Sequence, residues 1–433
     1  MTKKCINVGL IGCGVVGTGV ANNLVNGTAQ KRHLNCELKL KKIADLYPYK
    51  ERAYKLPLDL FTTNADDILD DPEIDIVVEL IGGCGIALSV ITKALENKKN
   101  VVTANKALLA EYGPRLAALA NENGVDLYYE AAVCGGIPVI KSIREGLTAD
   151  TIKSVRGIVN GTCNYILTRM GKDQMAFDDA VKAAQQNGYA EADPTFDLIG
   201  KDSLHKLVLL CANCFGSWVK PENISTEGIM GLDQIDIRCA YELGYVIKLL
   251  AWAKEKDGRL ECMVAPTLID KGSMLAKVSD AYNAVEINGT PIGRTVYYGE
   301  GAGMDATSSA VTADIIDIAR NIHSGSVGRL PVFALDKEIE VVPAPEMEMR
   351  YYLRWKTDDK PGVIAALSNV LTERNIGISS VILHEFAKAQ PYSIVTFMTR
   401  ETKEAQMKDA IAELDKLGCI QSKTVMLRVE SGF

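Results

Sequence analysis

Short apolar runs alternate with amphipathic segments through the first 130 residues of the chain. Each apolar run is bounded by glycine, proline or polar residues, which is typical of a buried strand, whereas the intervening segments have helical periodicity. Strands that alternate with helices predict a doubly wound parallel sheet with helices on both faces. We expect strands at 6–11, 38–44, 75–81, 100–103 and 125–130, and helices at 15–24, 86–96 and 114–121.

The pattern changes after the Gly-Gly-Ile-Pro sequence at 135–138. Strand-like and helix-like segments now occur without regular alternation, which predicts a mixed α/β substrate domain. We expect helices at 139–147, 180–187 and 238–254, and β-rich runs at 152–159, 260–268 and 295–298. A glycine-rich turn at 299–303 precedes a helix at 305–322, which is expected to return to the first domain.

A Pro-Ala-Pro linker at 343–345 precedes a separate C-terminal pattern. Its segments follow the order βαββαβ, which is the ferredoxin-like arrangement. The strands are expected at 349–356, 376–383, 393–399 and 424–428, and the helices at 364–373 and 404–417. The predicted fold class is therefore α/β, with a Rossmann-type domain at 1–132, a mixed catalytic domain at 133–304 and a ferredoxin-like domain at 350–433.

The composition is that of an ordinary soluble protein with two or three domains. The 433 residues carry a formal net charge of −7 and no basic patch, which argues against binding to nucleic acid or to an anionic membrane. No apolar stretch approaches the roughly 20 residues of a membrane span. The 11 cysteines are scattered and odd in number, which fits a reducing compartment, so we expect a cytoplasmic protein.

A glycine-rich turn follows the first strand and opens a helix. In a dinucleotide site Gly12 permits the tight turn, Gly14 lets the backbone approach the pyrophosphate, and Gly17 lets the helix pack against the strand. Val15 and Val16 begin the helix, whose N-terminus would hold the phosphates. Because the flanking strand and helix are both present, dinucleotide binding is favoured over a merely structural turn.

Asp45 follows the second strand, where an acidic side chain can accept hydrogen bonds from the adenosine ribose hydroxyls. Its distance from the glycines exceeds the usual ~20 residues, and the polar segment 26–35 would form the loop that absorbs the excess. A carboxylate repels a 2′-phosphate, so NAD is favoured over NADP, although Lys50 and Arg52 lie just downstream and could offset the repulsion. An ordinary loop acid remains the alternative interpretation of Asp45.

The segment 188–206 concentrates carboxylates and a lysine around a turn rich in proline and glycine. A helix begins within it and places Asp202 and Lys206 four residues apart on one face. On spacing alone, an exposed salt bridge is the simplest interpretation of such a pair. Thr103 and Lys106 fall at the carboxyl end of a strand, where ligands of parallel sheets bind, so the chain as a whole indicates catalysis.

Together these motifs resemble those of monofunctional homoserine dehydrogenases that carry a C-terminal ACT regulatory domain. The resemblance spans nearly the whole chain. It rests on the glycine fingerprint, on Thr-x-Asn-Lys at 103–106, and on an Ala-x3-Gly run leading into Asp-Pro-x2-Asp and Gly-x-Asp-x3-Lys at 184–206. Asp-x-Pro-Gly-Val at 359–363 resembles the first turn of ACT modules, which bind free amino acids. No aspartate kinase segment precedes the fingerprint, so the fused bifunctional form is not expected.

The resemblance implies reversible NAD(P)H-dependent reduction of L-aspartate 4-semialdehyde to L-homoserine, on the route to threonine, methionine and isoleucine. Lys206 would be the proton donor, because an ammonium both stabilises negative charge on the oxygen and supplies the proton. Lys106 would lie near the nicotinamide and the substrate. Glu191 and Asp202, supported by Asp197, would bind the α-ammonium and hydroxyl of the substrate. The further cofactor-binding residues would be Thr103, Lys106, Gly188 and Gly303.

The resemblance also implies a monovalent cation, usually sodium, held by backbone oxygens of Glu130, Val133, Gly135 and Ile137. The ACT domain would bind an amino-acid effector, with threonine expected, and the chain would form a homodimer or homotetramer. Two other interpretations stay open, namely a saccharopine-type or amino-acid oxidoreductase that shares the Rossmann half, and a non-catalytic regulator that senses NAD and amino acids. The spacing of acid and lysine after residue 200 argues against the first, and the intact lysines argue against the second.

Overall fold

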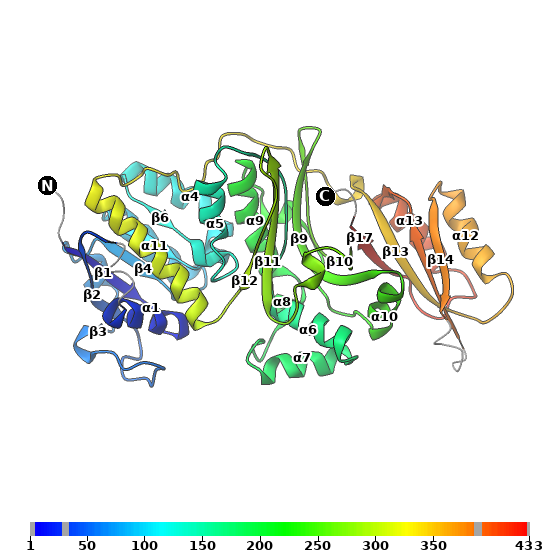
Figure 1. Ribbon diagram of the computed structural model, residues 1–433, viewed down its shortest axis with the longest axis horizontal. Coiled ribbons are helices and arrows are strands. Elements are labelled where there is room, and N and C mark those ends of the chain that lie inside the picture. The colour runs from blue at the N-terminus through cyan, green and yellow to red at the C-terminus, as the bar shows by residue number, and fades with distance from the viewer. Residues whose placement is uncertain (1–4, 28–33, 385–391, 431–433) are drawn as a thin grey trace. The chain divides into compact units, whose positions relative to one another are not determined.

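The computed structural model describes residues 5–27, 34–384 and 392–430 (Figure 1). The expected loop at 26–35 lies partly outside the described residues. The chain divides into two compact units, each made of three stretches. The first unit comprises Met1–Val155, His205–Pro221 and Asn283–Glu338, and the second comprises Arg156–Leu204, Glu222–Tyr282 and Ile339–Phe433.

A six-stranded parallel sheet forms the centre of the first unit. Its strands are β1 (Cys5–Ile11), β2 (Glu37–Ala44), β3 (Phe61–Thr62), β4 (Ile76–Glu79), β5 (Asn100–Thr103) and β6 (Leu127–Tyr128). They follow the order β3-β2-β1-β4-β5-β6, which is the order of a dinucleotide-binding Rossmann sheet. β4 and β5 are buried along their whole length, as expected for central strands covered on both faces. The doubly wound sheet predicted from the sequence is confirmed.

The helices of the first unit cover this sheet (Figure 1). They are α1 (Val15–Asn26), α2 (Asp66–Leu69), α3 (Gly85–Glu96), α4 (Lys106–Asn123), α5 (Val139–Lys141) and α11 (Met304–Ser324). α11 packs against α1, and its buried residues join the core of the parallel sheet. α4 begins well before the expected start at 114 and contains Pro114. The start signal is Asn105, whose side chain accepts a hydrogen bond from the Leu108 backbone N–H.

Further strands of the first unit belong to a second sheet, in the order β12-β11-β7. They are β7 (Thr151–Ile158), which continues into the second unit, β11 (Tyr282–Thr290) and β12 (Gly293–Glu300). Short helical turns lie at η2 (Leu58–Leu60), η3 (Glu130–Ala132) and the π-helical η4 (Ser142–Gly146).

The helices of the second unit precede a long β-hairpin in the sequence. They are α6 (Gly161–Lys172), α7 (Phe177–Gln186), α8 (Thr195–Leu198), α9 (Lys201–Phe215), whose last turns belong to the first unit, and α10 (Gln234–Glu242). The short elements η5 (Pro221–Asn223), β8 (Ser225–Thr226), η6 (Leu275–Lys277) and η7 (Ala344–Glu346) connect the larger ones.

The expected helix at 238–254 is wrong. β9 (Tyr245–Lys256) occupies most of this segment and pairs antiparallel with β10 (Arg259–Asp270) along its whole length. Gly244, with φ of 91°, ends the preceding helix, and the positive φ values of Asp257 and Gly258 suit a two-residue hairpin turn. The apolar run in β9 is a buried strand, because pairing with β10 outweighs the helix propensity of its leucines and alanines.

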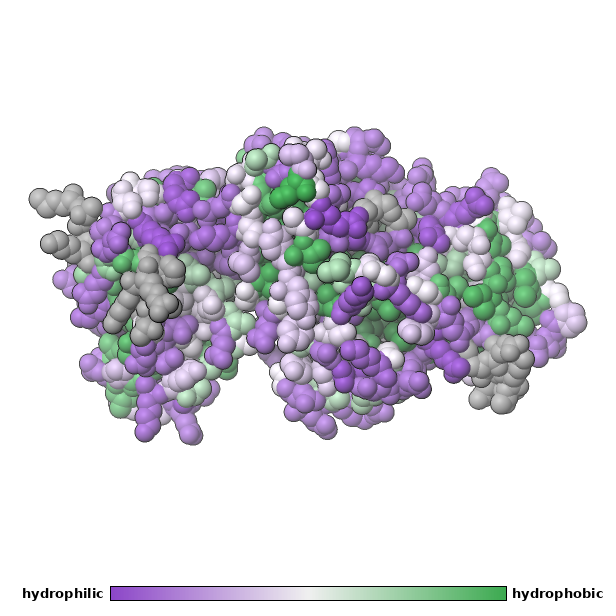
Figure 2. All heavy atoms as spheres, viewed as in Figure 1, coloured by the Kyte–Doolittle hydropathy of each residue, from purple (hydrophilic) through white to green (hydrophobic). Residues whose placement is uncertain are grey.

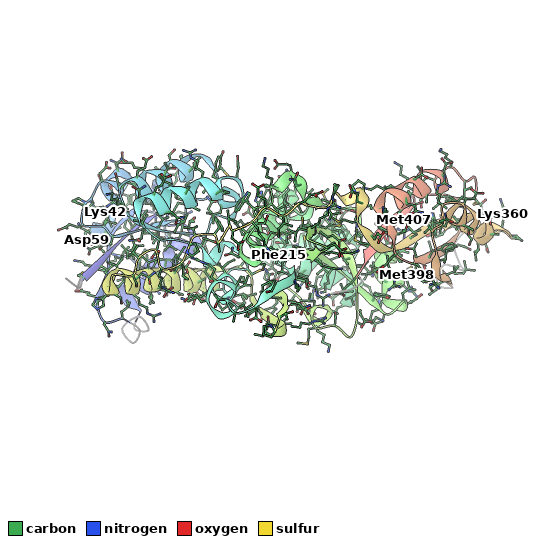
Figure 3. All side chains as sticks on the ribbon, turned by 90° about the horizontal axis from the view of Figure 1, so that it is seen from above. Lys42, Asp59, Phe215, Lys360, Met398 and Met407 are labelled. Atoms are coloured by element: carbon green, nitrogen blue, oxygen red, sulfur yellow. The ribbon has the colours of Figure 1, made fainter. Side chains whose placement is uncertain are left out.

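The C-terminal part of the second unit has the predicted βαββαβ order. Its elements are β13 (Glu348–Thr357), α12 (Val363–Glu373), β14 (Ile378–His384), β15 (Ser393–Thr399), β16 (Thr402–Lys403), α13 (Glu404–Leu414) and β17 (Val425–Val429). The sheet order is β17-β13-β15-β14, and β17 also pairs in parallel with β10. Met398 of β15 and Met407 of α13, both labelled in Figure 3, are buried within this module.

Hydrophobic side chains gather on the surface over β14 and α12 (Figure 2). Ile364, Val381 and Leu383 are among the exposed apolar residues there. β14 is the last strand in the order of its sheet. Among the described residues, no helix is both long and apolar enough to cross a membrane.

Candidate active site

The glycine turn between β1 and α1 has the geometry that a dinucleotide requires. Gly12 has φ of 93°, and a Cβ there would lie 2.7 Å from the Leu80 backbone. A Cβ on Gly17 would lie 2.2 Å from the Gly12 oxygen, so only glycine lets the helix pack this closely. Gly14 faces open space and is the N-cap of α1 without a side-chain cap. The backbone N–H groups of Val15 and the following residues are therefore available to an anion.

Asp45 follows β2 and holds the glycine turn from one side. Its Oδ2 accepts a hydrogen bond of 2.7 Å from the Cys13 backbone N–H, and its Oδ1 accepts one of 2.8 Å from the Tyr47 backbone N–H. The Arg52 guanidinium lies 3.4 Å from Oδ1, donates to the Cys13 carbonyl oxygen and stacks over the Phe61 ring. The sequence predicts the acid at this place, but its hydrogen bonds to the turn itself have no sequence signal.

A chain of hydrogen bonds fixes the loop that carries Lys106. Thr103 donates to the buried Glu79 carboxylate over 2.6 Å, and the Asn105 backbone N–H donates to Thr103. The Asn105 side chain donates to the Gly83 carbonyl oxygen. The other oxygen of Glu79 accepts from the backbone N–H groups after β4. Lys106 is thereby held as the first residue of α4, at the carboxyl edge of the parallel sheet.

α9 carries the acid and the lysine that the sequence singles out. Asp202 lies in its first turn, and Lys206 follows one turn later on the same side. Both side chains are buried, with exposures of 5% and 8%. The alternative of an exposed surface salt bridge is therefore wrong. An acid and an ammonium kept from bulk water have stronger electrostatic effects than an exposed pair.

Asn160 is a functional candidate that the sequence analysis missed. Its side-chain amide donates to Asp197 Oδ1 and to Asp202 Oδ2, each over 2.8 Å. Its oxygen accepts from the Cys163 backbone N–H and caps α6. One amide thus holds two carboxylates next to each other, and such a pair can attract a positively charged group. The only sequence signal is the Asn-Gly-Thr capping pattern at 160–162, which is common at helix starts.

The loop before α8 carries two further acidic residues, Glu191 and Asp193. The Thr162 hydroxyl donates to the Tyr189 carbonyl oxygen, and the Gln185 side-chain amide donates to the Glu191 carbonyl oxygen, so side-chain donors hold the backbone of the loop. Gly188 has φ of 75° and ends α7, and the Glu191 side chain is exposed. Asp193 accepts from the Thr195 backbone and hydroxyl, which lowers the pKa of its carboxyl. Asp193 therefore stabilises the turn that precedes α8.

The segment from Glu130 to Ile137 forms a tight turn in the first unit. Cys134 and Gly135 have φ of 57° and 51°, and a Cβ on Gly135 would lie 2.5 Å from the Gly301 oxygen. Val133 and Gly135 are buried, and within the described ranges their carbonyl oxygens accept no hydrogen bond. Two buried oxygens of this kind could serve as ligands of a hard cation, whereas the carbonyl oxygens of Glu130 and Ile137 already accept hydrogen bonds from the backbone N–H groups of Val133 and Val139. Side-chain clusters of three His, Cys, Asp or Glu that could hold a metal are absent from the described residues.

A buried carboxylate pair fixes one end of this turn. The Glu130 backbone N–H donates to Asp314 over 2.8 Å, and the Glu130 carboxylate accepts from the backbone N–H groups of Ile140 and Lys141. Burial raises the pKa of the Glu130 carboxyl to about 7. Burial and the neighbouring Glu130 also raise the pKa of Asp314. Gly303, the last predicted cofactor residue of this unit, is the N-cap of α11.

The Rossmann sheet, the open glycine turn and the buried acid and lysine on α9 define an NAD(P)-dependent oxidoreductase. Two family models match the chain. The model described as "Homoserine dehydrogenase, NAD binding domain" matches residues 12–130, and the model described as "Homoserine dehydrogenase" matches residues 138–316. Because these matches cover more than half of its length, the chain belongs to the homoserine dehydrogenase family.

Known proteins support the same assignment over the full length. A homoserine dehydrogenase of Neisseria gonorrhoeae is 42% identical over 436 residues, which cover 99% of each chain. The crystal structure of a homoserine dehydrogenase from Thiobacillus denitrificans is 40% identical, covers 99% of each chain and superposes with a TM-score of 0.91. A hyperthermophilic archaeal homoserine dehydrogenase in complex with NADPH is 25% identical, covers 73% of this chain and 98% of its own, and has a TM-score of 0.61.

Proposed function

We propose that this chain reduces L-aspartate 4-semialdehyde reversibly to L-homoserine, in the cytoplasm, as a step toward threonine, methionine and isoleucine. The observation that carries the proposal is the pair of carboxylates held by Asn160, one of which lies a helical turn before the buried Lys206. A carboxylate pair suits the α-ammonium of an amino-acid substrate. A lysine ammonium suits the oxygen of an aldehyde that becomes an alcohol.

The residue roles follow from charge and hydrogen bonding. When bound, NAD(P)H supplies the hydride that adds to the aldehyde carbon. Lys206 holds a proton on Nζ, stabilises the negative charge that develops on the oxygen and transfers the proton to it. Asp202 and Glu191, with Asp197 in support, bind the ammonium and hydroxyl of homoserine. Lys106 contributes a second positive charge, and the Glu79 network orients the loop that carries it.

A direct assay tests this function. The full-length protein is incubated with L-homoserine and NAD or NADP, and the absorbance of the reduced cofactor is followed. We expect absorbance to rise with homoserine, and not with saccharopine or other amino acids. If homoserine gives no reduction of either cofactor, the proposed reaction is refuted and a regulator without catalysis becomes the better interpretation.

We propose that NAD is preferred over NADP, because Asp45 places a carboxylate at the end of β2. Asp45→Ala should shift the ratio of kcat/KM values toward NADP by roughly tenfold, about 1.4 kcal/mol. The change removes the repulsion of a 2′-phosphate and frees Arg52 from its carboxylate partner. It should also weaken NAD binding, since the turn loses the acceptor of the Cys13 N–H.

The matched control is Asp59→Ala, which removes an exposed carboxylate of the same unit (Figure 3). It should leave the cofactor ratio as in the unaltered protein. An unchanged ratio in Asp45→Ala would mean that this carboxylate serves only the glycine turn.

A bound sodium ion is proposed for the turn that contains Val133 and Gly135, on the strength of their unbonded buried carbonyl oxygens. The ion would tie the segment before α5 together. Replacing sodium chloride by choline chloride at equal ionic strength should lower the midpoint of thermal unfolding, because a ligand that binds only the folded state stabilises it. Equal midpoints in the two salts would contradict sodium binding.

The C-terminal βαββαβ module is proposed to be an ACT regulatory domain that binds threonine. The full-length enzyme should lose activity as threonine rises to millimolar levels, measured by initial rates of homoserine oxidation. Methionine and isoleucine serve as comparison ligands. If none of them changes the rate, feedback regulation is refuted, whereas the dehydrogenase assignment is unaffected.

A homodimer or homotetramer is also proposed. The supporting feature is β14, the last strand in the order of its sheet, which carries the exposed Val381 and Leu383 and so offers hydrogen-bonding groups and apolar surface to a second copy. Light scattering of the purified protein gives the mass. A monomer at micromolar concentration would refute the assembly.

A further inference from the structure

A groove lies in the second unit where α6, α10 and β9 pack against one another. Its volume is about 820 Å³, which is within the usual range for small-molecule sites. Aliphatic side chains form much of its wall, including Leu167, Ile235, Ile237 and Val246. The groove contains none of the residues assigned to the dehydrogenase reaction.

Two lysines of the groove lack a carboxylate partner. The Lys248 ammonium is 5% exposed and donates to Asn164 Oδ1 over 2.8 Å and to the Val278 carbonyl oxygen over 2.6 Å. Both acceptors are neutral, and a lysine has a third N–H to give. Lys172 is exposed on the rim, and across the described part of the chain neither lysine forms an ion pair within 4.0 Å. A ligand with a negative group would complement both charges.

The pKa of Lys248 reflects the same shortage of negative charge. Burial and the nearby Lys172 lower it to about 8, and Asp280 opposes this only in part. At neutral pH the ammonium is still mostly protonated. An anion in the groove would therefore meet a charged and poorly solvated partner.

Gln234 supplies a hydrogen-bond acceptor to the groove. Its Nε2 donates to the Met170 carbonyl oxygen over 3.1 Å, which fixes the orientation of the amide. Its Oε1 is buried and has no hydrogen-bond partner. An unmade hydrogen bond of a buried acceptor is costly, so the groove has a place for a donor on a ligand.

Lys248 and Gln234 both hydrogen-bond to α6. Lys248 bonds to the Asn164 side chain and Gln234 to the Met170 carbonyl oxygen, so contacts with one helix hold both groups in place.

α10 also contacts the C-terminal module, and one of its contact residues, Glu242, lines the groove as well. Asp236 forms two hydrogen bonds with Arg354 of β13, and Glu242 bonds to His384 of β14 over 2.6 Å. The helix wall of the groove is therefore anchored before any ligand arrives. An anchored wall favours binding, because less conformational entropy is lost.

We propose that this groove binds a free α-amino acid with an aliphatic side chain, with its carboxylate on Lys248 and Lys172 and its ammonium on Gln234. The aliphatic walls take the side chain. The site is separate from the proposed effector site of the ACT module and from the substrate carboxylates, and binding to it can be measured without catalysis.

Isothermal titration calorimetry on the full-length protein tests the proposal with three probes of one shape. L-Leucine carries both charged groups, 4-methylpentanoate lacks the amine and 3-methylbutylamine lacks the carboxylate. We expect leucine to bind with a millimolar or lower Kd, the carboxylate alone to bind several-fold more weakly, and the amine not to bind.

Two variants locate the bound ligand. Lys172→Met and Lys248→Met should each weaken leucine binding roughly tenfold or more, since each removes a hydrogen bond to a charged group. Lys172 is exposed, so its variant folds even if Lys248→Met does not. Lys182→Met, on the exposed face of α7, removes the same charge outside the groove and should not change the Kd.

Two results would overturn the proposal. The first is the absence of heat from leucine, isoleucine, valine and methionine at millimolar concentration. The second is leucine binding that is unchanged in Lys172→Met, which would assign the ligand to another site such as the C-terminal module.

Discussion

Lys206→Ala is expected to lower kcat by ~10²-fold or more, the usual contribution of a general acid. The side chain is 8% exposed and lies in the middle of α9, where alanine preserves the helix. Only the proposed proton donor is lost. Initial rates of homoserine oxidation give kcat, and fluorescence titration with NADPH gives the cofactor Kd, which should change little.

The control for this experiment is Lys201→Ala, because Lys201 is an exposed lysine at the start of the same helix. It should retain nearly full kcat. If Lys206→Ala also keeps its kcat, Lys206 is not the donor, and Lys106 becomes the residue to test next.

Arg354→Met is expected to lower the free energy of unfolding by about 3–5 kcal/mol, the cost of breaking a buried ion pair. Arg354 is 4% exposed and donates to Asp236 over 2.6 and 3.0 Å. Asp236 is fully buried, and among the described residues its carboxylate would still accept hydrogen bonds from the Tyr352 hydroxyl and the Asp233 backbone N–H without the guanidinium. The measurement is the urea unfolding transition of the second unit.

Two further variants separate the ion pair from general damage. Arg374→Met breaks a pair with the exposed Asp409 in the same module and should cost at most about 1 kcal/mol. The double variant Arg354→Met with Asp236→Asn removes both charges and should recover much of the loss. A double variant as unstable as Arg354→Met alone would show that packing of the arginine, and not its charge, stabilises this contact.

The parts of the fold with strong local signals could be predicted from the sequence. The Rossmann strands have short apolar runs bounded by glycine and polar residues, and the C-terminal module has strand-like and helix-like segments in the order βαββαβ, so the predicted sequence of elements was correct. The helix expected at 238–254 was wrong, because the periodicity of a short apolar run does not distinguish a helix from a buried strand. The distinction depends on pairing with β10, which lies beyond the hairpin turn.

Some features of the candidate site could likewise be predicted from the sequence, and others could not. Gly12 and Gly17 could be assigned because only glycine fits their backbone geometry, which the structure confirms. The two hydrogen bonds of Asn160 could not be predicted, since they join residues 37 and 42 positions apart. The pairing of the C-terminal module with β10 could not be predicted either. The Pro-Ala-Pro segment indicated a linker between separate domains.

The position of β17 has a consequence for how the chain is made. This strand consists of Val425–Val429, yet it lies between β10 and β13 and pairs with both. Synthesis proceeds from the N-terminus, so the residues of β10 and β13 that pair with β17 leave the ribosome before residues 425–429 can bond to them. A deletion of residues 425–429 would thus remove an interior strand. Loss of so few residues would leave two open strand edges, which invite aggregation and degradation.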